Sequence, residues 1–274
     1  MKKVLKVYRA ERFSPNSVKN DRAIIDAVGD LLEKKGFNVA GVSEYELSAN
    51  DVSDIYLTMA RSDEALTVLN KKEAEGGIVI NPTNGIRSCR RSTIDKLMRD
   101  NGLPAAPLTG EYGYWLKRGD EAAQSPKDVV FTANDSERDN AMQSFKERGI
   151  TDVVVTAHVN GDVVKFYGVC GTGFFKTFYA DDGNYSKFGD ERLNGKPQHY
   201  NFNINKLRND AERLAALVGV DVYGGDCIVR HDGTYAIIDF NDWPSFARCR
   251  DEAANAITQK VETYCNTDAT GNKE

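Results

Sequence analysis

The chain has 274 residues, of which 41% are hydrophobic and 28% are charged, the composition of an ordinary globular protein. Its formal net charge of -5 argues against nonspecific binding to nucleic acid, which needs a basic face to release counterions from phosphates. The five cysteines include no C-x-x-C pair, so neither a zinc site nor a disulfide framework is indicated. The apolar run after Lys3 is interrupted by Lys6 and Arg9, so we expect a cytoplasmic protein without a signal peptide or membrane contact.

Strands and helices alternate over residues 1–80. Short apolar runs predict strands over 4–8, 37–42, 55–59 and 78–80. Apolar residues at helical spacing predict one helix that carries Ile24 to Leu32 and ends at Gly36, and a second helix over about 63–72. This alternation predicts a parallel sheet, and therefore an α/β domain over residues 1–80.

The pattern changes after Asn81-Pro82. A helix is predicted over about 92–101, closed by Gly102 and Pro104. Strands over 112–117 and 129–131 and a polar helix over 135–148 follow. This order is typical of a small α+β lobe, which we place at about 104–156.

Two hairpins are predicted in the last part of the chain. The first joins 152–159 to 162–169 through Asn160-Gly161, a pair that supplies the positive φ angles of a tight turn. The second joins 223–229 to 235–240 through His231-Asp232-Gly233. Helices are predicted over 205–218 and 251–264, so a C-terminal lobe covers about 157–265, and the polar tail 266–274 is expected to fray.

Asp226 and Asp239 fall in the two arms of the second hairpin. In an antiparallel pair they can lie side by side, and Asn241 points to the same face because side chains alternate along a strand. Adjacent carboxylates repel and raise each other's pKa unless a cation neutralises them, and Mg²⁺ takes oxygen donors of this kind together with nucleotide phosphates. The pattern favours an Mg-ATP site. The alternative is that Asp239 caps a turn and Asp226 is exposed in a loop.

The same segment carries a resemblance to a known superfamily. Gly225-Asp226-Cys227-Ile228-Val229, followed by Ile237-Ile238-Asp239-Phe240-Asn241-Asp242-Trp243-Pro244, resembles the terminal metal-binding element of ATP-grasp proteins with a glutathione synthetase-like ATP-binding domain. Further segments resemble the entry to the ATP-binding lobe: Asn81-Pro82, Asp95-Lys96, Gly102-Leu103-Pro104 and Pro107. The resemblance implies that Asp226, Asp239 and Asn241 hold Mg²⁺. It also implies an α/β fold with α+β lobes, in which an ATP-grasp domain over 81–274 follows a Rossmann-like domain over 1–80.

Other positions of the family carry over one by one. Lys117 resembles the lysine that reaches the α- and β-phosphates of ATP, and Lys165 resembles a lysine that faces the phosphates or the acceptor. The segment 153–158 looks like the hinge strand that reads the adenine edge, which implies nucleotide contacts from Thr156, Ala157 and His158. Two features depart from the family pattern: the loop 118–127 contains a single glycine, Gly119, and the only acidic residue near the hinge that could hold the ribose is Asp162.

Three arginines are candidates for binding the acceptor. Arg9 and Arg12 follow the first strand and Arg61 follows the third. Loops after parallel strands face the crevice in which ligands bind in open α/β sheets, and a guanidinium suits a carboxylate or a phosphate. We therefore expect an anionic small-molecule acceptor; the alternative is that these arginines are solvated surface residues.

The resemblance implies an enzyme that uses ATP and Mg²⁺. Most ATP-grasp proteins are ligases that join a carboxylate to an amine or thiol through an acylphosphate, and a minority are kinases. The motifs are nearest to those of ribosomal-protein glutamate ligases and of inositol polyphosphate kinases, and the kinase likeness lies in Gly161-x-x-x-Lys165-x-Tyr167 and Asp239-x-Asn241-x-x-Pro244. The ligase is the favoured hypothesis, a polyol or inositol phosphate kinase the alternative, and a degenerate nucleotide-binding protein the second alternative. The sequence names neither the acceptor nor the oligomeric state.

Overall fold

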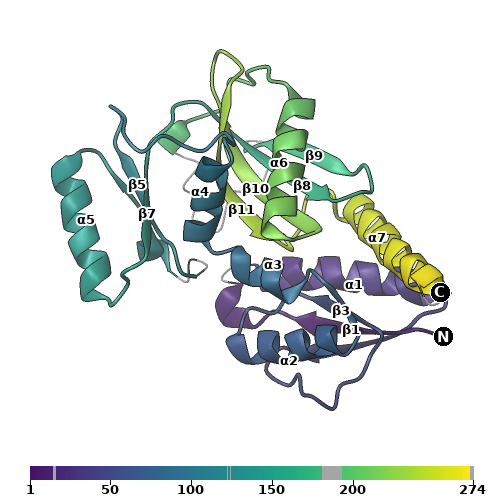
Figure 1. Ribbon diagram of the computed structural model, residues 1–274. Helices are drawn as coiled ribbons and strands as arrows, with labels where there is room; N and C mark the ends of the chain where they lie inside the picture. The colour runs from purple at the N-terminus through teal and green to yellow at the C-terminus, as the bar shows by residue number, and fades with distance from the viewer. Residues whose placement is uncertain (15–16, 122, 124, 181–192, 272–274) are drawn as a thin grey trace.

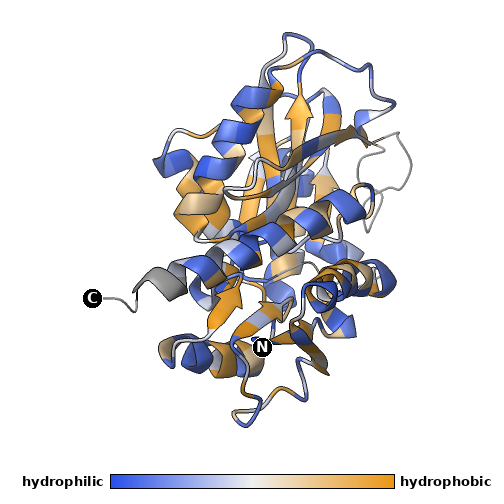
Figure 2. Cartoon of the chain, turned by 90° about the vertical axis from the view of Figure 1, so that its right-hand side faces the viewer, coloured by the Kyte–Doolittle hydropathy of each residue, from blue (hydrophilic) through white to orange (hydrophobic). Residues whose placement is uncertain are grey.

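The described part of the chain forms three β-sheets. The structure is a computed structural model that describes residues 1–14, 17–121, 123, 125–180 and 193–271. In Figure 1 a parallel sheet from the N-terminal part lies below a large antiparallel sheet, and a small antiparallel sheet lies to the left of the large one. Figure 2 shows apolar residues concentrated on the strands and on the inner faces of the helices, as expected for layers that share buried cores.

The N-terminal sheet confirms the predicted alternation. It comprises β1 (Lys3–Tyr8), β2 (Asn38–Ser43), β3 (Ile55–Thr58) and β4 (Ile78–Ile80), with α1 (Val18–Lys34) and α2 (Asp63–Ala74) between them. All neighbouring strands are parallel, in the order β2-β1-β3-β4. The helix α1 buries Ile24, Ile25, Val28 and Leu32, so the apolar spacing in the sequence does mark the face that packs on the sheet.

A polar side chain joins this sheet to the rest of the protein. Asn81 follows β4 and is fully buried. Its Nδ2 donates to the carbonyl of Val222 at 2.8 Å, and its Oδ1 accepts from the amides of Asp221 at 2.9 Å and Val222 at 2.8 Å. The helix α3 (Thr83–Ser88), which the sequence analysis did not predict, and α4 (Arg91–Asp100) come next.

The small sheet has the order β6-β5-β7. Its strands are β5 (Tyr114–Arg118), β6 (Val129–Thr132) and β7 (Val153–Ala157), with the short 3-10 helix η2 (Pro126–Asp128) before β6 and α5 (Asp135–Glu147) after it. Leu116, Phe145 and Ile150 form its buried core. The α5 helix covers the sheet on the side away from the large sheet (Figure 1), which leaves the opposite face to line a cavity.

The large sheet shows that the first predicted hairpin is wrong. Its order is β11-β10-β8-β9, with β8 (Asp162–Val169), β9 (Phe175–Tyr179), β10 (Val222–Val229) and β11 (Tyr235–Asp242). The strand β7 pairs with β5 in the small sheet, whereas β8 pairs with β9 and β10. Asn160-Gly161 therefore connects two different sheets. Gly161 has a φ of 152°, and a Cβ there would lie 2.3 Å from the carbonyl oxygen of Val229, so close packing on β10 also requires glycine.

The second predicted hairpin is confirmed. β10 and β11 are antiparallel and Asp226 lies directly opposite Asp239, beside a register shift between Asp226 and Cys227. Asp226 is also the register partner of Lys165 on β8. The three side chains thus form one row across three neighbouring strands, where facing residues interact directly.

The C-terminal helix connects the large sheet to the N-terminal unit. α6 (Ile204–Val218) packs on the large sheet, and α7 (Arg250–Gly271) packs against α1 and β8. α7 continues to Gly271, so residues 266–271, expected as a frayed tail, are helical. Trp243 and Phe246 lie in the same buried cluster as Ile24 and Leu57. Within the described residues, no helix combines the length and apolar character needed to cross a membrane.

Replacing Asn81 by alanine should destabilise the protein. The change leaves the amides of Asp221 and Val222 without their acceptor, whereas the Val222 carbonyl still accepts from the amide of Trp243. An unsatisfied buried amide costs about 1–3 kcal/mol. We expect the free energy of unfolding in urea to fall by at least about 2 kcal/mol. Asn84→Ala, at an exposed position of α3, is the matched control. Equal unfolding free energies for the two variants would contradict this role of Asn81.

Candidate active site

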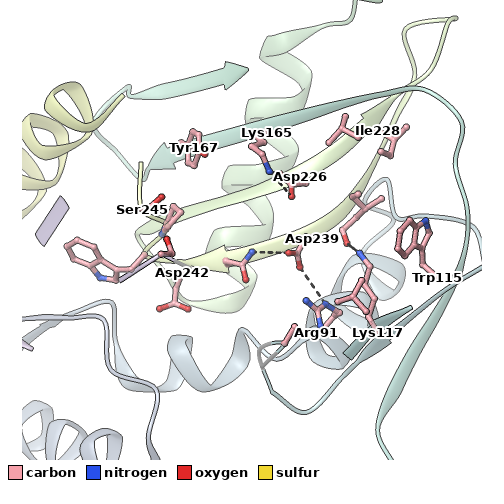
Figure 3. Close-up of a pocket in the computed structure, with 18 of the residues that line it drawn as sticks. Arg91, Trp115, Lys117, Lys165, Tyr167, Asp226, Ile228, Asp239, Asp242 and Ser245 are labelled. Atoms are coloured by element: carbon pink, nitrogen blue, oxygen red, sulfur yellow. Dashed lines mark hydrogen bonds and ion pairs between the residues drawn. The ribbon is translucent and has the colours of Figure 1, made fainter. Parts of the chain in front are cut away.

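A cavity of about 590 Å³ opens where the three sheets meet. The N-terminal unit contributes Arg9 and Arg61 to its lining, and the small sheet contributes Lys117 with Thr156, Ala157 and His158 at the end of β7. The large sheet contributes four further predicted residues: Lys165, Asp226, Asp239 and Asn241. The structure therefore brings together residues that are far apart in the chain (Figure 3).

The centre of the cavity is the carboxylate pair Asp226 and Asp239. Both lie within strands and not in a loop or turn, which excludes the alternative of a turn cap and an exposed loop residue. Asn241 donates from Nδ2 to Oδ2 of Asp239 at 3.2 Å. Two neighbouring anions are unfavourable in a partly buried position unless cations lie close to them.

Three cations surround this pair. Nζ of Lys165 lies 3.2 Å from Oδ1 of Asp226, and Nε of Arg91 lies 3.6 Å from Oδ1 of Asp239. Nζ of Lys117 donates to the carbonyl of Ile238 at 2.9 Å, so it reaches β11 from the small sheet (Figure 3). Burial by itself would raise the pKa of Asp239, but Arg91, Lys117, the Asn241 side chain and Lys165 outweigh burial and hold that pKa below its ordinary value. The carboxylate is thus ionised near neutral pH.

The donor set suits Mg²⁺ that arrives with phosphates. Among the residues described, no group of three or more His, Cys, Asp or Glu side chains could hold a metal ion. Two carboxylates and the amide oxygen of Asn241 are fewer than six oxygen donors, and Mg²⁺ commonly completes its octahedral shell with water and nucleotide phosphates. The residues present fit a shared metal-phosphate site and not an all-protein metal cage.

The small-sheet end of the cavity is aromatic and apolar. Nε1 of Trp115 donates to Nδ1 of His158 at 3.0 Å, and the ring of Phe131 lies 5.4 Å from that of Trp115 and 5.5 Å from that of His158. Because an indole N–H can only donate, His158 Nδ1 must be unprotonated here. Burial lowers the pKa of His158, although a hydrogen bond with Asn160 opposes the shift. Val163 and Ile228 complete a slot suited to a flat ring.

The arginines predicted to bind the acceptor are only partly brought together. Arg9 and Arg61 line the cavity, but both also hold other groups. Arg9 contacts Asp21 and donates to the carbonyls of Met59 at 3.1 Å and Trp243 at 3.2 Å. Arg61 forms an ion pair with buried Asp242 at 2.6 Å. These contacts join the N-terminal unit to the end of β11. They use only some of the N–H groups of the two guanidiniums.

Two predicted residues lie outside this cavity. Asp162 is buried, and its carboxylate accepts from the backbone amides of Gln198 at 2.7 Å and Tyr200 at 2.8 Å. It does not line the cavity, because its side chain is used to fix the chain before α6. Arg12 lines an adjoining cavity instead, and its guanidinium lies over the rings of Phe13 and Tyr45.

Sequence reasoning missed Arg91 and Trp115. Trp115 lies two residues before Lys117 on the same strand, so the period of two along a strand could have placed it on the cavity face. Arg91 opens α4, and its approach to Asp239 depends on how α4 packs against β11. No local pattern in the sequence carries that information.

Comparison with solved structures identifies the fold. The chain is similar to D-alanyl-alanine synthetase A from Vibrio cholerae, with a TM-score of 0.63, 11% identity and coverage of 94% of this chain and 98% of that chain. It is also similar to D-alanine–D-alanine ligase from Bacillus anthracis complexed with ATP (TM-score 0.63, 10% identity, 96% and 99% covered) and to the ligase from Coxiella burnetii (0.63, 9%, 98% and 100%). No protein-family model matches the chain, and no curated protein matches it. The expected α/β arrangement of the ATP-grasp fold is thereby confirmed.

The Trp115–His158 hydrogen bond should make stability depend on pH. The unfolded chain takes up a proton at His158 near pH roughly 6.5, whereas burial favours the neutral ring in the folded protein. Stability is therefore lost as pH falls through that value, until the folded form also protonates. We expect the difference in unfolding free energy between wild type and His158→Gln to shrink between about pH 7.5 and about pH 5.5. His231→Gln, at an exposed turn, is the control, and a difference for His158→Gln that does not change with pH would refute the interpretation.

Proposed function

We propose that the chain is a Mg-ATP-dependent ligase that joins a carboxylate of a small molecule to an amine or thiol and releases ADP and phosphate. One observation carries the proposal: a carboxylate pair shared by β10 and β11 faces three cationic side chains inside one cavity. That combination suits a polyanion that brings its own metal ion. The ATP-grasp fold supports the same conclusion.

Each part of ATP has a proposed set of contacts. The adenine lies in the aromatic slot, against Thr156, Ala157 and His158, and Trp115 forms one of its walls. Lys117 contacts the inner phosphates from the small sheet, and Lys165 steadies the phosphoryl group in transfer. Asp226, Asp239 and Asn241 hold Mg²⁺, which would neutralise charge on the phosphates as ADP leaves.

The acceptor lies at the other end of the cavity, between the large sheet and the N-terminal unit of residues 1–80. Its carboxylate faces the N–H groups that Arg9 and Arg61 have left over. A carboxylate oxygen attacks the γ-phosphorus and the bond to ADP breaks. The amine then attacks the acyl carbon, phosphate leaves, and the amine nitrogen loses a proton. The chain's residues contribute position and charge, because neither step needs a protein nucleophile.

Product analysis tests the ligase against its alternatives. Purified protein with Mg-ATP is assayed for ADP and for free phosphate, first with pooled amino acids and small carboxylates and then with inositol phosphates and sugars. A ligase releases equal ADP and phosphate only when both a carboxylate and an amine or thiol are present. ADP without free phosphate, with the γ-phosphoryl label on a polyol, would identify a kinase. Nucleotide binding without turnover in any pool would identify a degenerate binding protein.

Asp239→Asn should lower ATP turnover by about 100-fold or more, because it removes charge from the metal site. Its melting temperature should stay close to that of wild type, since the side chain is partly exposed and is not part of an apolar core. The matched control is Asp232→Asn, in the exposed turn between β10 and β11, which should turn over ATP as wild type does. Turnover in Asp239→Asn equal to that of the control would remove Asp239 from the metal site.

A further inference from the structure

A second cavity of about 260 Å³ adjoins the main one at the end of β11. The two cavities share Arg61, Arg91, Asp239, Asn241 and Asp242. The remaining walls come from the 3-10 helix η1 (Glu11–Phe13), the first turn of α2, the corner between α3 and α4 and the loop after β5. We call it the arginine cavity, after Arg12, Arg61, Arg87, Arg90 and Arg91 in its lining.

Arg87 and Arg90 have no acidic partner among the described residues. Arg61 is paired with Asp242 and Arg91 approaches Asp239, while Asp120 and Glu121 both pair with Arg118. Within the part of the chain that the structure describes, neither Arg87 nor Arg90 forms an ion pair. The unpaired carboxylates of the lining are Asp63 and Glu64, which are exposed in the first turn of α2, where the helix dipole stabilises negative charge.

The start of α4 carries positive charge. Arg90 is the N-cap of this helix and Arg91 its first residue, with no capping side chain and no acidic residue in the first turn. The first-turn amides of a helix lack intrahelical acceptors, and that end of the helix carries partial positive charge. An arginine N-cap supplies no acceptor and adds like charge. The amide of Ser92 is satisfied by the carbonyl of Gly119 at 3.2 Å, but the arginine N-cap itself breaks the usual capping preference, and such violations concentrate at functional sites.

We propose that the arginine cavity binds a second anionic group of the acceptor, a carboxylate or a phosphate, between Arg87, Arg90 and Arg12. The volume suits one such group and is below the range of whole-ligand pockets. Because Asp239 and Asn241 line both cavities, an acceptor held there has its reacting carboxylate beside the carboxylate pair. The acceptor is then a dicarboxylate or a phosphorylated acid. That the bound molecule is the acceptor rests on the proposed function. Anion binding by the arginines does not depend on that function.

Anion titrations of the full chain test the site directly. The probes are malonate and inorganic phosphate, titrated by calorimetry with a nonhydrolysable ATP analogue and Mg²⁺ present to occupy the main cavity. We expect one of the two probes to bind saturably, and the identity of that probe shows whether the site takes a carboxylate or a phosphate. The affinity for that probe should fall by about tenfold or more in Arg87→Gln and in Arg90→Gln. Arg213→Gln, which removes the same charge from an exposed position of α6, should bind as wild type does.

A second variant separates ligand binding from a structural role. Arg90→Asp places a good N-cap at α4, so it should raise the melting temperature of the ligand-free protein by about 2 °C or more and abolish anion binding. A lower melting temperature would assign Arg90 to the fold and overturn the proposal. So would unchanged probe affinity in Arg87→Gln and Arg90→Gln, or no binding of either probe to wild type. If the nucleotide analogue does not bind but the arginine-dependent anion binding persists, the site stands and the proposed function fails.

Discussion

The candidate active site depends on nearby positive charge, which keeps two carboxylates side by side. Asp226 and Asp239 face each other across β10 and β11, and this arrangement is stable only if positive charge is close. The cations come from three different elements: Lys165 from β8, Lys117 from the small sheet and Arg91 from the start of α4. Lys165 contacts Asp226, Arg91 contacts Asp239, and Lys117 donates to the carbonyl of Ile238 on β11. These contacts help to hold the three elements in place. The electrostatic requirement therefore links the two antiparallel sheets across the cavity.

The N-terminal unit positions the last strand from the opposite side. Arg9 donates to the carbonyl of Trp243, Arg61 pairs with Asp242, and the indole of Trp243 donates to Ile80 at 2.9 Å. Trp243 has a φ of 38°, a strained backbone conformation for a bulky residue that its surroundings must maintain. A residue after β1 and another after β3 thus fix the strand end that carries Asp239 and Asn241. This connection explains why arginines that face the cavity also belong to the framework.

The end of β11 is the meeting point of two cavities with different chemistry. The main cavity pairs a flat aromatic slot with a balanced set of carboxylates and cations, which suits a nucleotide with its metal ion. The arginine cavity has two guanidiniums, of Arg87 and Arg90, that form no ion pair with any described residue, and a helix N-terminus of the same sign. If both are filled, the nucleotide and the acceptor approach the carboxylate pair from two directions. The length of the acceptor would then be selected by the distance between the two cavities.

The sequence by itself determined most of the strands and helices and the faces they bury, but not α3, β9 or the last turn of α7. It also determined the hairpin of β10 and β11, because alternation and a short turn are local properties, and the pairing of Asp226 with Asp239 follows from that register. It did not determine the partner of β7, although Asn160-Gly161 is a strong turn signal: β7 pairs with β5, whereas β8 pairs with β9 and β10. Nor did the sequence determine that the Asp162 carboxylate accepts from backbone amides near residue 200. The approach of Arg91 to Asp239 depends on helix packing, and the sequence did not determine it either. Which edge, amide or carboxylate a residue meets is decided by contacts between distant segments, and only the tertiary structure establishes them.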